Sequence, residues 1–183
     1  MAFVDLARDR LVLKAALTGP PAVGKTTRIL QAGTAGRSET YGRTALGPQR
    51  MASMPLDTPH EGRSVELELY EWHGQERADV RGKGIFVGLD GLVFIADARE
   101  DRKVDTERHL EFLIDTVGRS RMRRLPALLL LGQHDEGLLR LSSYEGRLGG
   151  VQWSHRWEGG VEDAEGFLKA LRLYAEVMLT RTV

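Results

Sequence analysis

The feature that most constrains this chain is the glycine-rich segment at residues 19–26, GPPAVGKT, which fits the pattern G-x-x-x-x-G-K-[ST]. A mostly apolar run of strand length, residues 11–18, precedes it, and residues 25–31 are predicted to be helical. Glycines in such a turn let successive backbone N–H groups point at one anion, and the following helix adds its positive N-terminal end. Lys25 would supply a cation to the β- and γ-phosphates of a nucleotide, and Thr26 a hydroxyl to Mg²⁺. The segment therefore predicts a strand–loop–helix unit that binds a nucleoside phosphate.

Predicted strands and helices alternate along the rest of the chain. Helices are predicted at 103–118 and at about 163–179, where apolar residues recur with helical spacing. Residues 33–59 are rich in Gly, Pro, Ser and Thr, so we expect mostly loop there, with a short edge strand near 51–56. The remaining predicted strands are 64–71, with one face in solvent, the buried runs 91–98 and 126–131, and a brief strand at 151–153.

This alternation predicts the fold class. We expect one domain over residues 1–183, which is long enough to bury a single well-developed core. Its fold should be α/β, with a doubly wound, mostly parallel sheet of about six strands and helices on both faces.

The composition excludes several functional classes. Lys and Arg total 26 and so do Asp and Glu, so a broad electrostatic attraction to nucleic acid or to an anionic membrane is not expected. The absence of cysteine excludes disulfides, thiolate catalysis and Cys-ligated zinc. Charged residues interrupt any signal-peptide run near the N-terminus, and from the residues at the two ends we expect no lipid anchor. We therefore expect a soluble cytoplasmic protein with no direct membrane anchor.

A second motif follows the predicted strand at 64–71. Residues 71–77, EWHGQER, resemble the D-x-x-G-Q-E segment of Ras-like GTPases. The resemblance places Gly74 where a glycine amide senses the γ-phosphate and Gln75 where a glutamine positions the attacking water. Glu71 replaces the family's aspartate, which contacts Mg²⁺ through water.

Within that superfamily the chain most resembles the bacterial gliding-motility (MglA-like) GTPases. They share an aspartate-free version of the second motif, a Pro-Leu-Asp such as that at 55–57, a strand similar to 91–98, and an Arg-Thr pair matched by Arg43 and Thr44. The resemblance implies that Thr44 closes over Mg²⁺ and the γ-phosphate, and that Arg43 is an arginine finger in cis. It also implies a GTPase-activating partner of the roadblock type, effector proteins, and a role in cell polarity or motility.

The base-reading residues depart most from the family. Its guanine-reading N-K-x-D corresponds to residues 132–135, GQHD, in which the asparagine is lost and Gln133 stands in place of the lysine. Asp135 is retained, and its carboxylate can accept hydrogen bonds from the N1–H and exocyclic amine of guanine. No S-A-K loop is recognisable, and Ser154 is the nearest candidate for that base contact. Around the first switch, residues 45–52 contain an apparent insertion.

The sequence therefore predicts a nucleotide site for GTP or GDP with Mg²⁺. Gln75 and Arg43 are the catalytic candidates, and Thr26, Thr44 and Glu71 are the candidates for holding the metal. The expected nucleotide contacts are Gly19, Pro20, Pro21, Ala22, Val23, Gly24, Lys25, Thr26, Thr27, Thr44, Gly74, Gln133, Asp135 and Ser154. The five histidines, His60, His73, His109, His134 and His155, have no metal-ligand spacing and are interpreted as surface or packing residues.

The function predicted from these residues is a GTP-binding molecular switch with slow, Mg²⁺-dependent hydrolysis that partners stimulate. Two alternatives stay open. A pseudo-GTPase, which binds nucleotide weakly and never hydrolyses it, is favoured by the altered base motif and opposed by the retained Lys25, Thr26 and Gln75. A small P-loop kinase would need an arginine-rich lid, which only residues 119–124 could supply.

Overall fold

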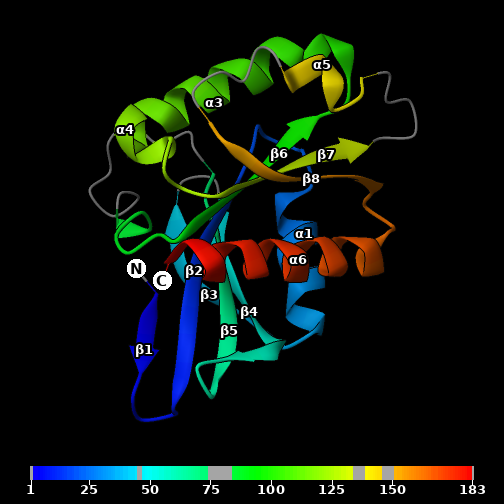
Figure 1. The fold of residues 1–183 in the computed structure, drawn as a ribbon. Coiled ribbons are helices and arrows are strands. Elements are labelled where there is room, and N and C mark those ends of the chain that lie inside the picture. Colours follow the sequence, from blue (N-terminus) through cyan, green and yellow to red (C-terminus); the bar gives the residue numbers. More distant parts are fainter. Residues whose placement is uncertain (1, 45–46, 74–83, 134–138, 146–150, 183) are drawn as a thin grey trace.

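In the computed structural model, which describes residues 2–44, 47–73, 84–133, 139–145 and 151–182, one mixed sheet forms the centre of the molecule (Figure 1). Among these residues the sheet has eight strands in the order β3-β4-β5-β2-β6-β7-β8, and β1 pairs with β2. The strands are β1 (Phe3–Asp5), β2 (Arg10–Thr18), β3 (Arg37–Thr44), β4 (Gly47–His60), β5 (Arg63–Glu71), β6 (Gly91–Asp97), β7 (Ala127–Gln133) and β8 (Trp153–Gly160). The helices are α1 (Lys25–Thr34), the 3₁₀ turn η1 (Glu100–Arg102), α3 (Lys103–Val117), α4 (Arg119–Met122), α5 (Ser142–Glu145) and α6 (Ala164–Thr182).

The expected fold class, a mostly parallel sheet of about six strands, is wrong. Strand β2 is parallel to β5 and β6, and β7 is parallel to β6 and β8. The pairs β1–β2, β3–β4 and β4–β5 are antiparallel, so the sheet is mixed.

Most of the difference comes from residues 33–59, where the sequence predicted mostly loop and only a short edge strand near 51–56, which lies within β4. They form the antiparallel strands β3 and β4, although β4 contains three prolines. Pairing of β3 with β4 ends at Ser53, and pairing of β4 with β5 begins at Met51, so Pro48 and Pro55 each lie where β4 has one neighbour. A proline cannot donate a ladder hydrogen bond, and such half-paired positions tolerate it.

Two apolar cores lie on opposite faces of the sheet because successive strand residues point to opposite sides. On one face, Ile29 of α1 and Phe167 of α6 pack against odd-numbered residues of β2 such as Leu17. On the other, Leu113 of α3 packs with Phe94 of β6 and with residues of α4 and α5. Figure 1 shows α3, α4 and α5 together above the sheet, away from α1 and α6.

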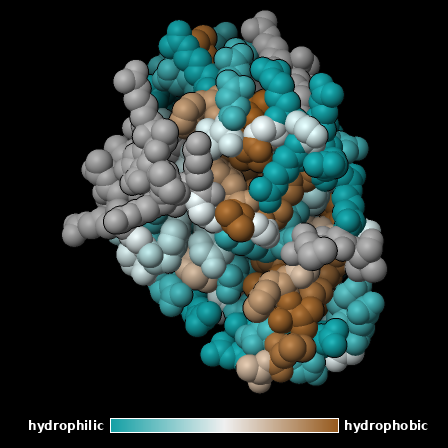
Figure 2. Space-filling view, turned by 90° about the vertical axis from the view of Figure 1, so that its left-hand side faces the viewer, coloured by the Kyte–Doolittle hydropathy of each residue, from teal (hydrophilic) through white to brown (hydrophobic). Residues whose placement is uncertain are grey.

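A cavity lies at the start of β2, at the end remote from the glycine-rich loop. Its volume is about 440 Å³, and Phe3, Val12 and Val87 contribute apolar walls. Lys14 beside it donates through Nζ to the carbonyl of Val87 at 2.9 Å. Phe3, Leu6 and Val87 are exposed, and Figure 2 shows apolar atoms among hydrophilic ones on the side of the molecule that carries β1. None of the described helices is long and apolar enough to cross a bilayer.

Candidate functional site

The glycine-rich loop connects the end of β2 to the start of α1, as the sequence predicted. Gly19 is required by close approach, because a Cβ there would collide with the carbonyl oxygen of Ile95 on β6. Pro20 and Pro21 have no N–H, so the amides that could bind an anion begin at Ala22. The first amides of an α-helix have no partner within the helix, which leaves the N–H groups at the start of α1 available to a phosphate.

Two positive φ angles shape the middle of this loop. Ala22 has φ 62° and Gly24 has φ 89°, both in the left-handed region that turns a backbone N–H out of its regular direction. Alternation of right- and left-handed residues forms the concave anion-binding arrangement called a nest. A non-glycine residue at positive φ is uncommon and costs free energy, so Ala22 marks a conformation imposed by its surroundings.

The ammonium group of Lys25 lies under this loop. Its Nζ donates to the carbonyl oxygens of Gly19 at 2.8 Å and Pro20 at 2.7 Å, and the residue is 6% exposed. Burial lowers the pKa of Lys25 to about 8, against the opposing attraction of the Glu71 carboxylate. The side chain therefore keeps its charge at neutral pH and is fixed in place before it meets a phosphate.

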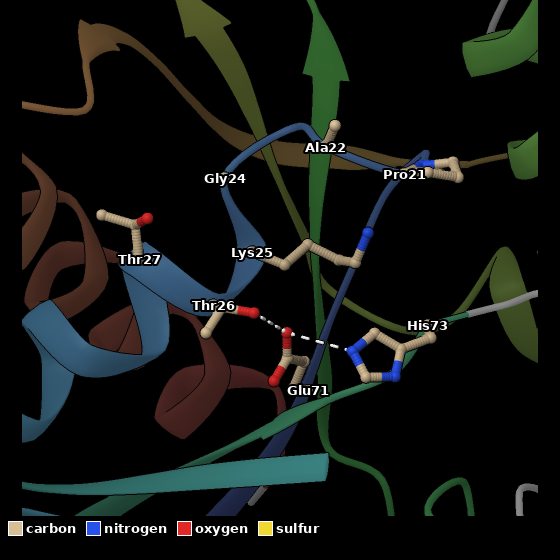
Figure 3. Close-up of a pocket in the computed structure, with 8 residues that line it drawn as sticks. All are labelled: Pro21, Ala22, Gly24, Lys25, Thr26, Thr27, Glu71 and His73. Carbon is tan, nitrogen blue, oxygen red and sulfur yellow. Dashed lines mark hydrogen bonds and ion pairs between the residues drawn. The ribbon is translucent and has the colours of Figure 1, made fainter. Parts of the chain in front are cut away.

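Glu71 is brought to the loop by strand pairing. Strand β5 is parallel to β2 with Glu71 beside Leu17, so its last residue lies at the same sheet edge as the loop. The fully buried carboxylate accepts a hydrogen bond through Oε1 from the hydroxyl of Thr26 at 2.6 Å (Figure 3). Burial raises the pKa of Glu71, but the contacts with His73 and Thr26 outweigh it and hold the pKa below its usual value.

Thr26 and Glu71 fit a magnesium site. Mg²⁺ prefers oxygen ligands and in nucleotide sites usually has only one or two from the protein, the others coming from phosphates and water. Glu71 Oε2 is buried and has no hydrogen-bond partner among the described residues, so it has unused capacity to accept. The described part of the chain has no cluster of three or more His, Cys, Asp or Glu side chains that could hold a metal without such help.

His73 is a site residue that sequence reasoning missed. Its Nε2 lies 3.3 Å from Glu71 Oε1, and its side chain is 16% exposed. It lines the same cavity of about 440 Å³ as the loop, with Pro21, Ala22, Gly24, Lys25, Thr26, Thr27 and Glu71, although Thr27 points away from Glu71 (Figure 3). The sequence does contain a signal for it, because alternate side chains of an extended segment point to the same side, so a residue at position 73 lies on the same side as Glu71.

The first switch is only partly described. Arg43 and Thr44 end β3 and pair with Pro48 and Gly47 of β4; their side chains lie outside the described part of the structure. Tyr41, two residues earlier, donates its hydroxyl to the carbonyl of Glu71 at 2.6 Å. The end of β3 is therefore tied to the end of β5, next to the glycine-rich loop.

The second switch lies outside the described residues. Gly74 and Gln75 follow His73 directly, and the structure describes the chain again from residue 84. Sensing of the γ-phosphate by Gly74 and positioning of water by Gln75 stay predictions.

The end of β7 lies beside the glycine-rich loop. A Cβ on Gly132 would lie 3.2 Å from Cγ2 of Val23, which is buried in the core. Gln133 is the last residue of β7 and pairs with Gly160. The side chain of Gln133 and the whole of Asp135 lie outside the described residues, so base reading by this segment stays a prediction.

Ser154 lies at the other end of the sheet, and the structure does not bring it to the loop. It is the second residue of β8, where its hydroxyl accepts from the backbone N–H of Ala127 at 3.4 Å. Strand β8 was expected at 151–153 but runs to Gly160. For this reason the segment at the edge of the glycine-rich loop is 161–163, and a Cβ on Gly24 would lie 3.2 Å from Cγ1 of Val161.

Arg28 of α1 holds that segment in place. The guanidinium is buried and donates through Nη2 to the carbonyls of Gly159 at 3.0 Å and Gly160 at 2.7 Å. It also lies 4.9 Å from the ring centroids of Trp157 and Phe167. The helix that begins in the glycine-rich loop is thus fastened to the end of β8.

Neither a scan against protein-family models nor a search of curated proteins found a match for this sequence.

Proposed function

We propose that this chain is a GTP-binding molecular switch that hydrolyses GTP slowly with Mg²⁺ and acts through partner proteins. The observation that carries the proposal is the arrangement at the end of β2, where a buried, charged Lys25 and a Thr26–Glu71 pair line one cavity. A loop with positive φ at Ala22 and Gly24, a fixed cation and two oxygen donors suit a nucleoside phosphate with a divalent ion.

Each described group has a distinct role in the proposal. The amides from Ala22 onward and the Lys25 ammonium bind the phosphates. Thr26 and Glu71 would hold Mg²⁺, which supplies charge neutralisation on the phosphate oxygens. Most of the catalysis comes from positioning and electrostatic stabilisation, because phosphoryl transfer needs little covalent chemistry from the protein.

The remaining roles come from the resemblance to Ras-like GTPases. In this proposal Thr44 joins the metal ligands, Gln75 orients the attacking water and Arg43 stabilises the developing charge. Asp135 favours guanine over adenine. Release of the switch segments after hydrolysis changes the surface that partners bind. The partners proposed are a roadblock-type GTPase-activating protein and effectors of cell polarity or motility, in the cytoplasm.

Nucleotide binding is tested first. The purified protein is denatured, the released nucleotide is identified, and triphosphate affinity is measured for wild type and Lys25→Ala. We expect guanine nucleotide, and a loss of tight binding in the variant because the fixed cation is gone. Lys169→Ala removes an exposed lysine of α6 and should bind as wild type does. Equal binding by Lys25→Ala and wild type would refute the proposal.

A pseudo-GTPase is the second candidate, and the glycine at position 132 favours it. That residue packs against Val23 and has no side chain with which to contact a base or brace the loop. Single-turnover hydrolysis of GTP with and without Mg²⁺ separates the two candidates. Nucleotide binding without any Mg²⁺-dependent turnover would establish the pseudo-GTPase.

A further inference from the structure

The segment after β5 is built so that two polar side chains enter the cavity together. The backbone N–H of Trp72 donates to the carbonyl of Leu17 at 2.9 Å, which continues the pairing of β5 with β2. In such an extended segment neighbouring side chains point to opposite sides. Trp72 points into the core beneath α3, so Glu71 and His73 point the other way.

Trp72 fixes this orientation firmly. Its ring stacks on Phe112 with a centroid separation of 5.9 Å and an interplanar angle of 4°. It also meets Phe86 edge-on at 4.9 Å, and it is 6% exposed. Moving the backbone of this segment so that His73 leaves the cavity would require the large apolar surface of Trp72 to leave the core, which opposes the movement.

The imidazole of His73 is held only loosely at its inner nitrogen. Nε2 lies 3.3 Å from Glu71 Oε1, and that oxygen already accepts a hydrogen bond from Thr26 at 2.6 Å. Nδ1 is buried and has no hydrogen-bond partner among the described residues. A donor that shares its acceptor with another group in this way can exchange it for an unshared acceptor.

The charges in the cavity indicate what that acceptor is. The anion-binding loop and Lys25 lie on one side of the cavity, and Glu71 with His73 form the wall on the β5 side (Figure 3). The loop binds inner phosphates whether the nucleotide has two phosphates or three. A third phosphate would extend toward this wall, where the N–H of His73 can donate a hydrogen bond to it.

We propose that His73 donates its Nε2–H to the terminal phosphate of a bound nucleoside triphosphate and so lets the site distinguish triphosphate from diphosphate. This inference rests on the proposed function. It makes His73 a specificity-determining residue, and Glu71 holds the imidazole in the cavity when the third phosphate is missing. The matching expectation is that diphosphate affinity does not depend on His73.

The test compares wild type with His73→Leu and His73→Gln. Affinities for a non-hydrolysable guanosine triphosphate analogue and for GDP are measured by calorimetry in excess Mg²⁺. His73→Leu removes the donor, and His73→Gln keeps an N–H donor close to the position of Nε2. One lost charge-assisted hydrogen bond should lower the triphosphate-to-diphosphate affinity ratio about tenfold in His73→Leu. His73→Gln should recover most of that ratio.

The matched control is His155→Leu, which removes a partly buried histidine at the opposite end of the sheet and should leave both affinities unchanged. An unchanged ratio in His73→Leu would overturn the inference, and so would an equal loss of both affinities or a His73→Gln variant as defective as His73→Leu. Each of these results leaves wild-type nucleotide binding intact and with it the proposed function. Failure of wild type to bind either nucleotide would instead overturn the proposed function itself, together with this inference.

Discussion

Replacing Lys25 by methionine should change how the stability of the protein, freed of nucleotide, depends on pH. Burial lowers the pKa of Lys25 from 10.5 to about 8 in the folded protein. Between these values the unfolded chain binds more protons than the folded one, so the free energy of unfolding rises with pH in that window. Over the full interval between the two pKa values, at about 1.4 kcal/mol per pH unit, the free energy of unfolding changes by about 3 kcal/mol. Methionine has a similar length and no charge, so the variant lacks this contribution.

Urea unfolding at several pH values measures the effect. Nucleotide is first removed with a chelator, and the two proteins are compared at each pH so that all other titrating groups cancel. The free energy of unfolding of wild type minus that of Lys25→Met should rise by about 2 kcal/mol between pH 7.5 and 9.5. Lys169→Met, which removes an exposed ammonium, should follow wild type. Parallel curves for wild type and Lys25→Met would show that the ammonium is not buried under the glycine-rich loop, and would refute the reasoning.

Three further predictions concern the role of Gln75 in hydrolysis, the choice of nucleotide base, and the stability of the protein at acidic pH. Gln75→Leu should keep nucleotide affinity and slow single-turnover hydrolysis, and an unchanged rate would remove Gln75 from the mechanism. Wild type should prefer GTP over ATP roughly ten- to hundredfold, and Asp135→Asn should let XTP gain on GTP in competition binding; no gain would show that Asp135 does not read the base. Burial, with a smaller contribution from the Lys25 charge, lowers the pKa of His109 to about 3, so below pH 6.5 only the unfolded chain takes up a proton there. Wild type should therefore lose about 2 kcal/mol more stability than His109→Gln between pH 7 and 5, and an equal loss in urea unfolding would contradict this.

The central strands and long helices could be predicted from the sequence because their patterns are set by burial. The runs at 11–18, 64–71 and 91–98 match β2, β5 and β6 to within about one residue. The predicted edge strand at 51–56 lies within the longer β4, whereas β3 and the rest of β4 could not be predicted. They lie toward one edge of the sheet, where one solvated face and single neighbours permit Gly, Thr and Pro. Their antiparallel pairing is what makes the sheet mixed.

The part of the site that could be predicted is the glycine-rich segment, where the residue types and their spacing together indicate phosphate binding. Residues 19–26 lie between a strand and a helix as expected, and Glu71 meets Thr26 across 45 positions because β2 and β5 are parallel. The role of Ser154 depended on where β8 ends, which the brief apolar run at 151–153 could not show. Residues 153–160 are polar on much of their length, so the strand is recognised only through its pairing with β7.

The fastening of α1 by Arg28 has a consequence for synthesis of the protein. Arg28 and its acceptor Gly159 are 131 positions apart, so the guanidinium has no carbonyl partners in β8 until that strand has been translated. At about 5–20 residues per second the delay is roughly 7 to 26 s. During that interval α1 presents an arginine whose acceptors and aromatic neighbours are missing, and this disfavours its docking on the nascent sheet. The full set of contacts that fastens α1 to the sheet therefore forms only after β8 has been translated.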